Sequence, residues 1–382
     1  MVSERASGVT PFIAMDVLER ANEMDDVVHL EVGEPDFSPP DRVVETAVAS
    51  LRAGNTDYTA ARGKPELRRA IADRYDREYG VDVDPGRVVV TPGSSPGLFL
   101  AMAAAVDHGE EVVLTDPHYA CYPNFVRTVG GRVRTVPLYA ADGFQPRIPA
   151  FDAAVDEGTR ALLLNSPANP TGAVMDGDAL ASLVALADAN DATVLSDEVY
   201  HGLSYGVEEH TVLEYTDDAF VLDGFSKRFA MTGWRLGWMV VPPAYVDAVN
   251  RLAQNVLICA PNFVQDAGVA ALETPPDRLD SVRETYRERR DLLVDAVGDW
   301  GLDLGYTPEG AYYLLVDVSD LPGDALDVAD LLLEEAGVAV TPGVDFGDRA
   351  AEYLRFSYAT DVEAIEEAIA RIERLLETVE RV

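Results

Sequence analysis

The sequence contains very little lysine. Of its 30 basic residues, Lys64 and Lys227 are lysines and the other 28 are arginines. The 67 acidic residues give a formal net charge of −37, and they are spread along the whole chain. This composition predicts an acidic, solvated surface that repels nucleic acid and anionic membranes. It resembles the composition of proteins from salt-loving organisms, so we expect a halophilic protein whose stability rises with salt, because salt screens the self-repulsion.

Cysteine, histidine and long apolar runs are also scarce. The two cysteines, Cys121 and Cys259, lie far apart, and the five histidines show no ligand spacing. We therefore expect free thiols and no metal site. The longest apolar runs, such as 98–106, are too short to span a bilayer, and the first residues are interrupted by charge and proline, unlike a signal peptide. These features predict a cytoplasmic protein.

The middle of the chain alternates short apolar strands with helices. The strands are rich in valine and leucine and mostly not alternating with polar residues, which is typical of strands buried on both faces. The pattern predicts an α/β domain with a mostly parallel seven-stranded sheet flanked by helices. The expected strands are 87–93, 110–117, 133–138, 160–167, 192–200, 220–226 and 236–242, and the clearest helices are 65–80, 95–109 and 178–191.

The pattern changes after about residue 275. A long amphipathic helix at 277–300 precedes short strands near 311–318, 338–343 and 353–359, and a last helix covers 361–382. This arrangement predicts a smaller α+β domain, which residues 1–40 are expected to join. The predicted division is therefore a large domain at 41–275 and a small domain made of 1–40 and 276–382.

Polar residues follow three of the predicted strands, 87–93, 110–117 and 160–167, at their carboxyl ends, where open α/β sheets bind ligands. Gly93, Ser94 and Ser95 lie between a strand and a helix, where amides and hydroxyls can bind an anion, although an ordinary capped helix start has the same pattern. Tyr119 follows the next strand and could stack on a flat ligand or pack in the core. Asn169, in NPTG, could present its amide to a ligand or belong to a plain turn.

The next two strands are followed by charged residues. Asp197 ends a buried strand, with Tyr200 three residues later, and a buried carboxylate needs a cationic partner on the protein or on a cofactor. Lys227, in FSKRFAMTGWR, lies at the next strand end, where a buried lysine loses its proton readily and can form a Schiff base. Arg235 can bind phosphate through two hydrogen bonds. One ligand, pyridoxal phosphate, accounts for all these groups together.

The motifs YTAARGKPELR, NPTG, SDEVY, SKRFAMTGWRLG and LRFSYA appear in the order found in the class I and II aminotransferases of fold type I. The chain resembles this family over nearly its whole length. The resemblance implies a pyridoxal-phosphate-dependent aminotransferase that moves an amino group between an L-amino acid and a 2-oxo acid. The implied mechanism is ping-pong, with 2-oxoglutarate as the expected acceptor.

The resemblance also implies roles for the residues around the cofactor. Lys227 would hold pyridoxal phosphate as an internal aldimine and move the substrate proton, while Asp197 would pair with the pyridinium nitrogen. Tyr200 and Asn169 would form hydrogen bonds with the ring oxygen, and Tyr119 would stack on the ring. The phosphate would be bound by Gly93, Ser94, Ser95 and Arg235, with Ser226 as a weaker candidate.

Further residues are implied to bind the substrate or the second subunit. Arg355 would clamp the substrate α-carboxylate, and Gly33 and Asn169 would approach it. Tyr58 would reach the phosphate in a neighbouring subunit, which implies a homodimer with shared active sites. Lys64 has no implied role and is expected to be solvent-exposed.

The donor amino acid stays open. Ser95 occupies the place where some aspartate-using relatives carry lysine, and the early residues Phe12 and Ile13 are apolar, which favours neutral or aromatic donors. A C–S β-lyase or an aminocyclopropane-forming enzyme would keep the same cofactor residues. A cofactor-sensing transcription regulator is disfavoured by the acidic composition, and a nicotinamide dehydrogenase by the lack of a G-x-G-x-x-G motif after any strand.

Overall fold

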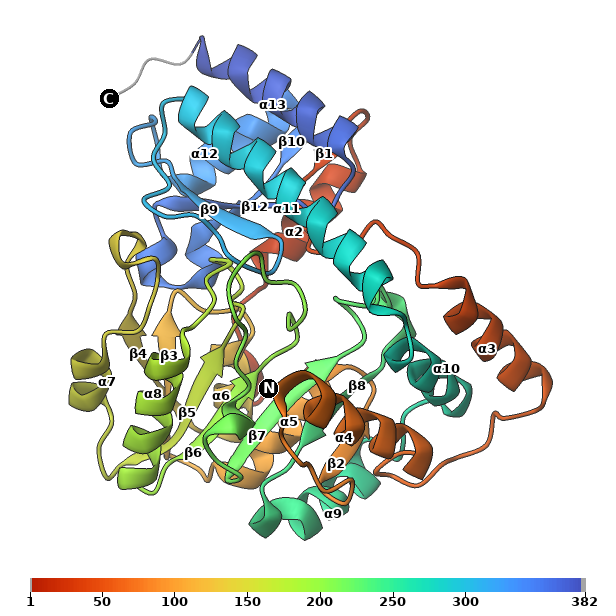
Figure 1. Ribbon diagram of the computed structural model, residues 1–382. Coiled ribbons are helices and arrows are strands. Elements are labelled where there is room, and N and C mark those ends of the chain that lie inside the picture. Colours follow the sequence, from red (N-terminus) through yellow and green to blue (C-terminus); the bar gives the residue numbers. More distant parts are fainter. Residues whose placement is uncertain (1, 379–382) are drawn as a thin grey trace.

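The computed structural model describes residues 2–378, and its large domain is built on one sheet of seven strands in the order β2-β8-β7-β6-β5-β3-β4 (Figure 1). Only β8 runs antiparallel to its neighbours, β2 and β7, so the predicted mostly parallel seven-stranded sheet is confirmed. The strands are β2 (Val88–Thr91), β3 (Glu111–Asp116), β4 (Arg132–Pro137), β5 (Thr159–Asn165), β6 (Thr193–Asp197), β7 (Ala219–Gly224) and β8 (Gly237–Val240).

Helices cover both faces of this sheet, which explains why its inner strands are mostly apolar on both faces. Val88 and Val90 of β2 belong to the core on one face, whereas Val89 belongs to the core on the other. The first face packs against α4 (Pro65–Tyr79), α7 (Ile148–Ala154), α8 (Gly177–Ala189) and α10 (Asn262–Leu272), with α3 (Asp41–Arg52) resting on α10. The second face packs against α5 (Ser94–Ala105), α6 (Tyr122–Val129) and α9 (Val246–Val256).

The parallel strands end at one edge of the sheet, and their order reverses beside β3. After β3 the chain forms β4 on one side and then β5, β6 and β7 in turn on the other. A ligand site is expected at such a switch point, outside the carboxyl ends of the strands. Asn165 and Asp197, the last residues of β5 and β6, are register partners at this edge.

The small domain lies above this edge in Figure 1 and has its own apolar core. Three antiparallel strands form a sheet in the order β11-β12-β9, and β1 pairs with β10 in parallel. The strands are β1 (Val28–His29), β9 (Tyr313–Asp317), β10 (Val338–Ala339), β11 (Thr341–Pro342) and β12 (Tyr353–Ser357). The helices are α2 (Ile13–Asn22), α11 (Pro276–Asp299), α12 (Ala325–Leu331) and α13 (Val362–Leu376).

Several short elements connect these parts. They are α1 (Glu4–Ser7), the π-helical turn Leu332–Ala336, and the 3₁₀ turns Ala140–Asp142, Val212–Glu214, Thr232–Trp234, Pro243–Tyr245, Gly343–Phe346 and Asp348–Ala350. The predicted last helix ends at Leu376, and its final four residues lie outside the described residues.

The first residues of the chain contact both domains. The Thr10 amide donates to Asn124 Oδ1 (3.1 Å) on α6 of the large domain, whereas α2 packs against β10 and β11 of the small domain. The predicted domain boundaries at residues 40 and 275 therefore stay a prediction. Among the described residues, no helix combines the length and apolar character needed to cross a membrane.

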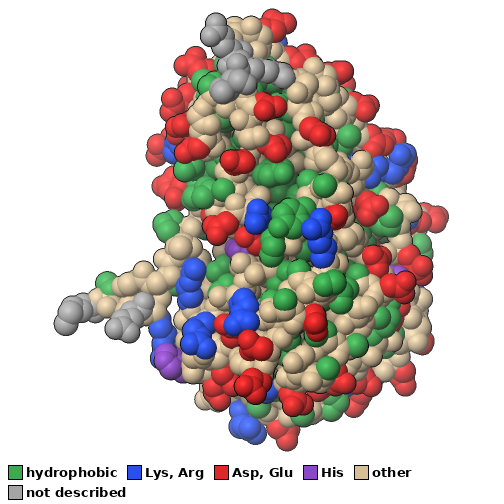
Figure 2. Space-filling model, turned by 90° about the vertical axis from the view of Figure 1, so that its left-hand side faces the viewer, with side chains coloured by type: hydrophobic (Ala, Val, Ile, Leu, Met, Phe, Trp, Pro, Cys, Tyr) green, Lys and Arg blue, Asp and Glu red, His purple; other side chains and the backbone are tan. Residues whose placement is uncertain are grey.

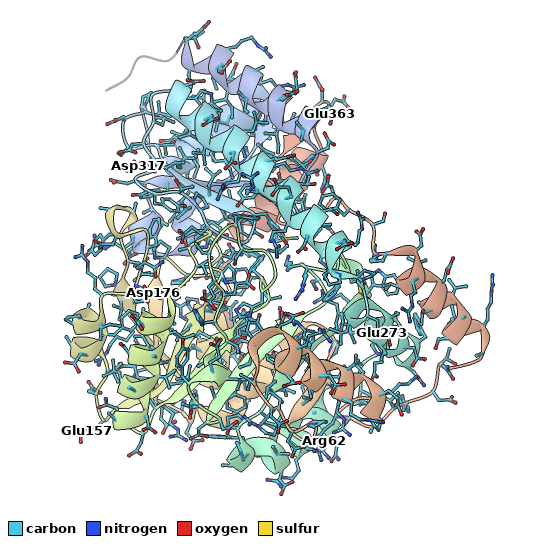
Figure 3. All side chains as sticks on the ribbon, viewed as in Figure 1. Arg62, Glu157, Asp176, Glu273, Asp317 and Glu363 are labelled. Atoms are coloured by element: carbon cyan, nitrogen blue, oxygen red, sulfur yellow. The ribbon has the colours of Figure 1, made fainter. Side chains whose placement is uncertain are left out.

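Acidic side chains dominate the surface that the figures show. Figure 2 shows them scattered over the whole face in view, with a smaller group of basic side chains in its lower half. The labelled side chains of Glu157 and Glu363 lie on the outside of the large and the small domain, respectively (Figure 3). This distribution agrees with dispersed surface acid rather than an acidic tail.

Candidate active site

A cavity of about 280 Å³ lies at the carboxyl edge of the large sheet, beneath the small domain. Its walls come from the segments after β2, β3, β5, β6 and β7, together with β12 and the chain around residues 12–33. The predicted site residues that line it are Gly33, Ser94, Ser95, Tyr119, Asn169, Asp197, Tyr200, Ser226, Lys227, Arg235 and Arg355.

Asp197 is a buried carboxylate at the end of β6, 7% exposed. The Tyr122 hydroxyl donates to its Oδ2 (2.8 Å), and the Val199 amide donates to its Oδ1 (3.3 Å). Within residues 2–378 no basic side chain forms an ion pair with it. Burial raises the pKa of Asp197 to about 6, although these two hydrogen bonds and the charge of Lys227 oppose the shift. A cation next to Asp197 would therefore be strongly favoured.

Lys227 follows β7 and points its amine into the cavity. Its Nζ donates to the Gly33 carbonyl (2.8 Å) and lies 5.7 Å from the ring centroids of Tyr200 and Tyr312. Burial is the largest influence on the amine and lowers the pKa of Lys227. A lysine held this way is suited to nucleophilic attack and to proton transfer.

Arg355 is a cation buried on β12, 3% exposed. Its Nη1 donates to Asn169 Oδ1 (2.9 Å) and its Nη2 donates to the Glu31 carbonyl (2.5 Å). The guanidinium lies between the rings of Tyr313 and Phe346, at 4.4 and 4.6 Å from their centroids. Its Nε has no hydrogen-bond partner, and no carboxylate of the described chain pairs with it. An anion entering the cavity would supply this missing charge.

The start of α5 forms a polar corner of the cavity. Gly93 precedes the helix with a φ of 95°, and Ser94 and Ser95 form its first turn. A side chain at Gly93 would lie 2.5 Å from Arg235 Nη2, so glycine allows the arginine to lie across the helix start. Arg235 is held there by donating from Nη1 to the Thr232 carbonyl (2.8 Å). Free helix amides, two hydroxyls and a guanidinium are well suited to a phosphate.

The rings of the cavity pack edge to face. Tyr119 contacts Tyr122 (centroids 5.4 Å apart) and Phe12 (6.0 Å), and the Tyr200 hydroxyl is 3.2 Å from the Tyr313 hydroxyl. Phe12 lines the cavity as the sequence suggested, but Ile13 is not among the lining residues.

Three residues of the site were missed in the sequence. Tyr122 holds Asp197, and its position three residues after Tyr119 in HYACYP was the available clue. Tyr313 stacks on Arg355, but it lies in the predicted strand 311–318, which contains no pattern that indicates a functional residue. Gly237 begins β8, and a side chain there would lie 2.7 Å from the Gly93 carbonyl carbon, a proximity that only the sheet order creates.

Two of the residues discussed from the sequence lie away from the cavity. Tyr58 is 82% exposed and does not line it. Lys64 was expected to be solvent-exposed, and this was wrong: its Nζ pairs with Asp266 Oδ1 (2.6 Å), and its side chain is 20% exposed. The pairing partner comes from α10, which packs against α4, so tertiary packing rather than local sequence determines its environment.

Comparison with known proteins gives consistent matches over the whole chain. The family model of aminotransferase class I and II matches residues 25–372. The valine–pyruvate aminotransferase of Mycobacterium tuberculosis is 40% identical, covering 96% of each chain. The (5-formylfuran-3-yl)methyl phosphate transaminase of Methanocaldococcus jannaschii is 35% identical, covering 98% of this chain and all 100% of its own.

A solved structure agrees with these matches. The structure of Thermus thermophilus aspartate aminotransferase with maleate superposes with a TM-score of 0.94, at 36% identity over 98% of this chain and 99% of that chain. All three proteins are named as transaminases, and none as a lyase. Their names give different substrates, so the shared fold does not identify the donor.

Proposed function

The chain belongs to the class I and II aminotransferase family, and we propose that it is a pyridoxal-phosphate-dependent member whose active site is the cavity around Lys227. As an aminotransferase of fold type I, it moves an amino group between an amino acid and a 2-oxo acid. One observation carries the assignment of the site. Asp197 and Arg355 line the same cavity as buried groups of opposite charge, and neither forms an ion pair within 4.0 Å with a described side chain.

The donor set of this cavity fits pyridoxal phosphate. Asp197 suits a protonated ring nitrogen, because this cation would pair with the buried carboxylate and stabilise its charged form. Ser94, Ser95 and Arg235 suit the phosphate, and Tyr119 offers a ring for stacking. When bound, the cofactor supplies an electron sink for the α-carbon of the amino acid.

The remaining polar groups would orient the ligand. Asn169 uses its Oδ1 to accept from Arg355, so its Nδ2 is left to donate to the ring oxygen. Tyr200 offers a hydroxyl on the same side of the cavity as Lys227, whose amine lies near its ring. Gly93 keeps the phosphate corner open for Arg235, and Ser226 adds a further hydroxyl next to Lys227.

Lys227 would perform the proton transfer, and Arg355 would orient the substrate for it. Because burial lowers the pKa of Lys227, more of its amine is neutral at working pH and able to accept a proton from the substrate α-carbon at Nζ. The Gly33 carbonyl orients this nitrogen by accepting its hydrogen bond. Arg355, held rigid between two rings, would bind the α-carboxylate and so fix the orientation of the α-carbon.

The active form is proposed to be a homodimer. Tyr58 is 82% exposed although it lies in the YTAARG motif, and its hydroxyl would reach the phosphate in the partner's site. Apolar side chains are exposed along the outer side of α3 at Val44 (40%), Val48 (39%) and Leu51 (49%). A second copy would cover this surface, because an apolar stripe of this kind on a surface helix marks an interface.

Two further proposals concern the acceptor and the working conditions. The acceptor is proposed to be 2-oxoglutarate, by analogy with the family. The net charge of −37 and the replacement of lysine by arginine support a halophilic enzyme that needs high salt. These proposals are independent of the assignment of Lys227.

A half-reaction assay tests the proposed function. The protein loaded with pyridoxal phosphate is mixed in high salt with single L-amino acids, and the cofactor absorbance is followed. We expect at least one amino acid to change the spectrum and a 2-oxo acid to reverse the change. No change with any amino acid would overturn the proposal. Pyruvate and ammonia released without a 2-oxo acid would identify a lyase instead.

The two lysines of the chain provide a matched pair of variants. Lys227→Ala should still bind the cofactor but should not react with amino acids. Lys64→Ala, which removes an ion pair with Asp266 outside the cavity, should keep the half-reaction. Activity retained in Lys227→Ala would refute the assignment of this residue.

A further inference from the structure

The first turn of α2 forms an apolar wall of the cavity. Phe12, Ala14 and Met15 line it from this turn, and Phe12 rests against the ring of Tyr119. Val32 adds to the same lining. A substrate whose α-carboxylate is bound by Arg355 would meet this wall with its side chain.

One distant carboxylate fixes the position of this wall. Asp345 accepts from the Ile13 amide through Oδ1 and from the Ala14 amide through Oδ2, both at 3.2 Å. Phe12, at the N-cap position of α2, provides no side-chain cap. Asp345, more than 330 residues away in sequence, therefore satisfies the first amides of the helix in place of a local cap.

The turn that holds Asp345 also contacts the carboxylate-binding arginine. It covers Gly343–Phe346, and the ring of Phe346 lies 4.6 Å from the guanidinium of Arg355. Two adjacent residues thus fix two parts of the substrate site: Asp345 holds the wall for the side chain, and Phe346 holds the cation for the α-carboxylate. A change at Asp345 should shift the first part relative to the second.

The charges of the cavity disfavour a negatively charged donor side chain. Its basic lining residues within the described chain are Lys227, Arg235 and Arg355, and each already has a task in the proposed reaction. A second carboxylate would therefore find no free cation. The one additional acid among the described lining residues, Glu31, directs its Oε1 to His29 Nδ1 (2.8 Å). Its Oε2 has no hydrogen-bond partner, and its carbonyl faces Arg355.

We propose, building on the proposed function, that the donor amino acid has an uncharged apolar side chain and that Asp345 is a positioning residue for donor selectivity. The apolar wall would bind the donor side chain by excluding water from it. Asp345 would not touch the substrate but would keep the wall at the correct distance from Arg355.

A donor series tests the substrate class. Single-turnover half-reactions of the loaded holoenzyme are compared for alanine, leucine, phenylalanine, aspartate, glutamate and arginine. We expect kcat/KM for leucine or phenylalanine to exceed that for aspartate at least about tenfold, as apolar contacts in a pocket discriminate on this scale. A faster reaction with aspartate or glutamate would overturn the proposal and indicate a cation from a partner subunit. A faster reaction with arginine would overturn it in favour of Glu31. No reaction with any donor would refute the proposed function instead.

Variants of Asp345 test the positioning role. We expect Asp345→Ala to raise KM for leucine about tenfold while changing KM for alanine less than about twofold, since a methyl group is too short to depend on the wall. Asp345→Asn keeps one acceptor oxygen and should recover part of the leucine KM. Because asparagine preserves the shape of the side chain, Asp345→Asn can test the positioning role even if Asp345→Ala does not fold.

A second helix cap in the small domain gives the matched control. Asp361 accepts from the Ala364 amide (2.8 Å) at the start of α13, remote from the cavity lining. Asp361→Ala removes a comparable cap and should leave the leucine-to-alanine ratio unchanged. An equal loss for leucine and alanine in the Asp345 variants, or the same change in ratio in Asp361→Ala, would show a merely structural role and overturn the proposal.

Discussion

Asp197, at the end of β6, and Arg355, on β12, line one cavity and are 7% and 3% exposed. Neither forms an ion pair with another described residue. Each is instead held by neutral groups, Asp197 by Tyr122 and Arg355 by Asn169. Burying unpaired charges is costly, and the cost is offset only when a ligand brings a cation to one residue and an anion to the other. The two residues are therefore the most direct points at which to test the site.

Replacing the buried carboxylate should weaken cofactor binding. We expect Asp197→Asn to reduce the affinity for pyridoxal phosphate about 10- to 100-fold, because hydrogen bonds to charged groups contribute about 1.5–3 kcal/mol. Tyr122→Phe, which removes a neutral donor from Oδ2 but keeps the charge, should weaken binding less. Titration of the apoprotein by absorbance measures both affinities. Equal losses in the two variants would contradict a role for the negative charge.

Replacing the buried guanidinium should weaken substrate binding without affecting the cofactor. Lysine keeps the charge but cannot form two parallel hydrogen bonds with a carboxylate, so we expect Arg355→Lys to lower kcat/KM for the donor at least about tenfold. Its affinity for pyridoxal phosphate should stay unchanged. Arg289, buried and bound to Asp36 through two hydrogen bonds of 2.8 and 2.7 Å, is the matched control, because Arg289→Lys should lower stability but not donor affinity.

The phosphate corner depends on a close approach that a methyl group would prevent. In Gly237→Ala the new methyl would lie 2.7 Å from the Gly93 carbonyl carbon and 2.8 Å from the Ser94 nitrogen. Such overpacking costs about 1–3 kcal/mol, and here it would displace the amides that we propose bind the phosphate. We expect weaker cofactor binding together with a lower melting temperature of the holoprotein. Gly298→Ala is the control, because Gly298 lies on α11 with no atom within 4 Å of the new methyl group. It should weaken neither cofactor binding nor thermal stability, since alanine is a better helix former than glycine.

The large sheet could be predicted from the sequence because burial on both faces leaves a simple pattern. Most of its strands are short apolar runs rich in valine and leucine, and the polar groups after them mark the expected ligand edge. The positions of Asp197 and Lys227 after such strands made them candidates, and the structure places both in the lining of one cavity. The strands β1, β10 and β11 have two residues each, too few for any periodicity. Their pairing depends on the packing of the small domain.

Contacts between distant segments could not be predicted in the same way. Lys64 pairs with Asp266, 202 residues later, and Asp345 caps α2 from 331 residues away. In both cases the partner is one acid among 67, and only the packed structure selects it. Tyr122 lies on α6, three residues after Tyr119, and its contact with Asp197 depends on where β6 ends in the packed structure.

The acidic surface predicts that stability rises with salt. The screening length falls from about 10 Å at 0.1 M salt to about 3 Å at 1 M. Because the chain has a formal net charge of −37, the repulsion among its acidic side chains should fall sharply over that range. We expect the melting temperature to increase between 0.1 and 2 M KCl. Sucrose at matched osmolality is the control for stabilisation by any solute that is excluded from the protein surface. Equal melting temperatures at both salt concentrations would contradict the expectation.

Glu198 predicts a separate dependence of stability on pH. This residue is 1% exposed, and burial raises its pKa to about 8. As the pH rises, the unfolded chain therefore loses this proton around a pKa of 4.5, whereas the folded protein keeps it until about pH 8. Since the folded state binds more protons between these values, the contribution of Glu198 to stability falls as pH rises from about 4.5 to about 8 and stays low above that.

A neutral variant of Glu198 should remove this dependence. Ser196, Thr211 and Val212 all donate to Oε1, whereas Oε2 has no hydrogen-bond partner. Glutamine can keep its oxygen at the Oε1 position and place its amide where Oε2 lies, so Glu198→Gln should preserve the three hydrogen bonds. We expect the variant to resemble the parent protein at pH 5 and to be more stable than it at pH 9. Denaturant unfolding of both apoproteins at the two pH values, in high salt, measures the difference. A stabilisation of equal size at pH 5 and pH 9 would show that the effect comes from packing rather than from titration of the carboxyl group.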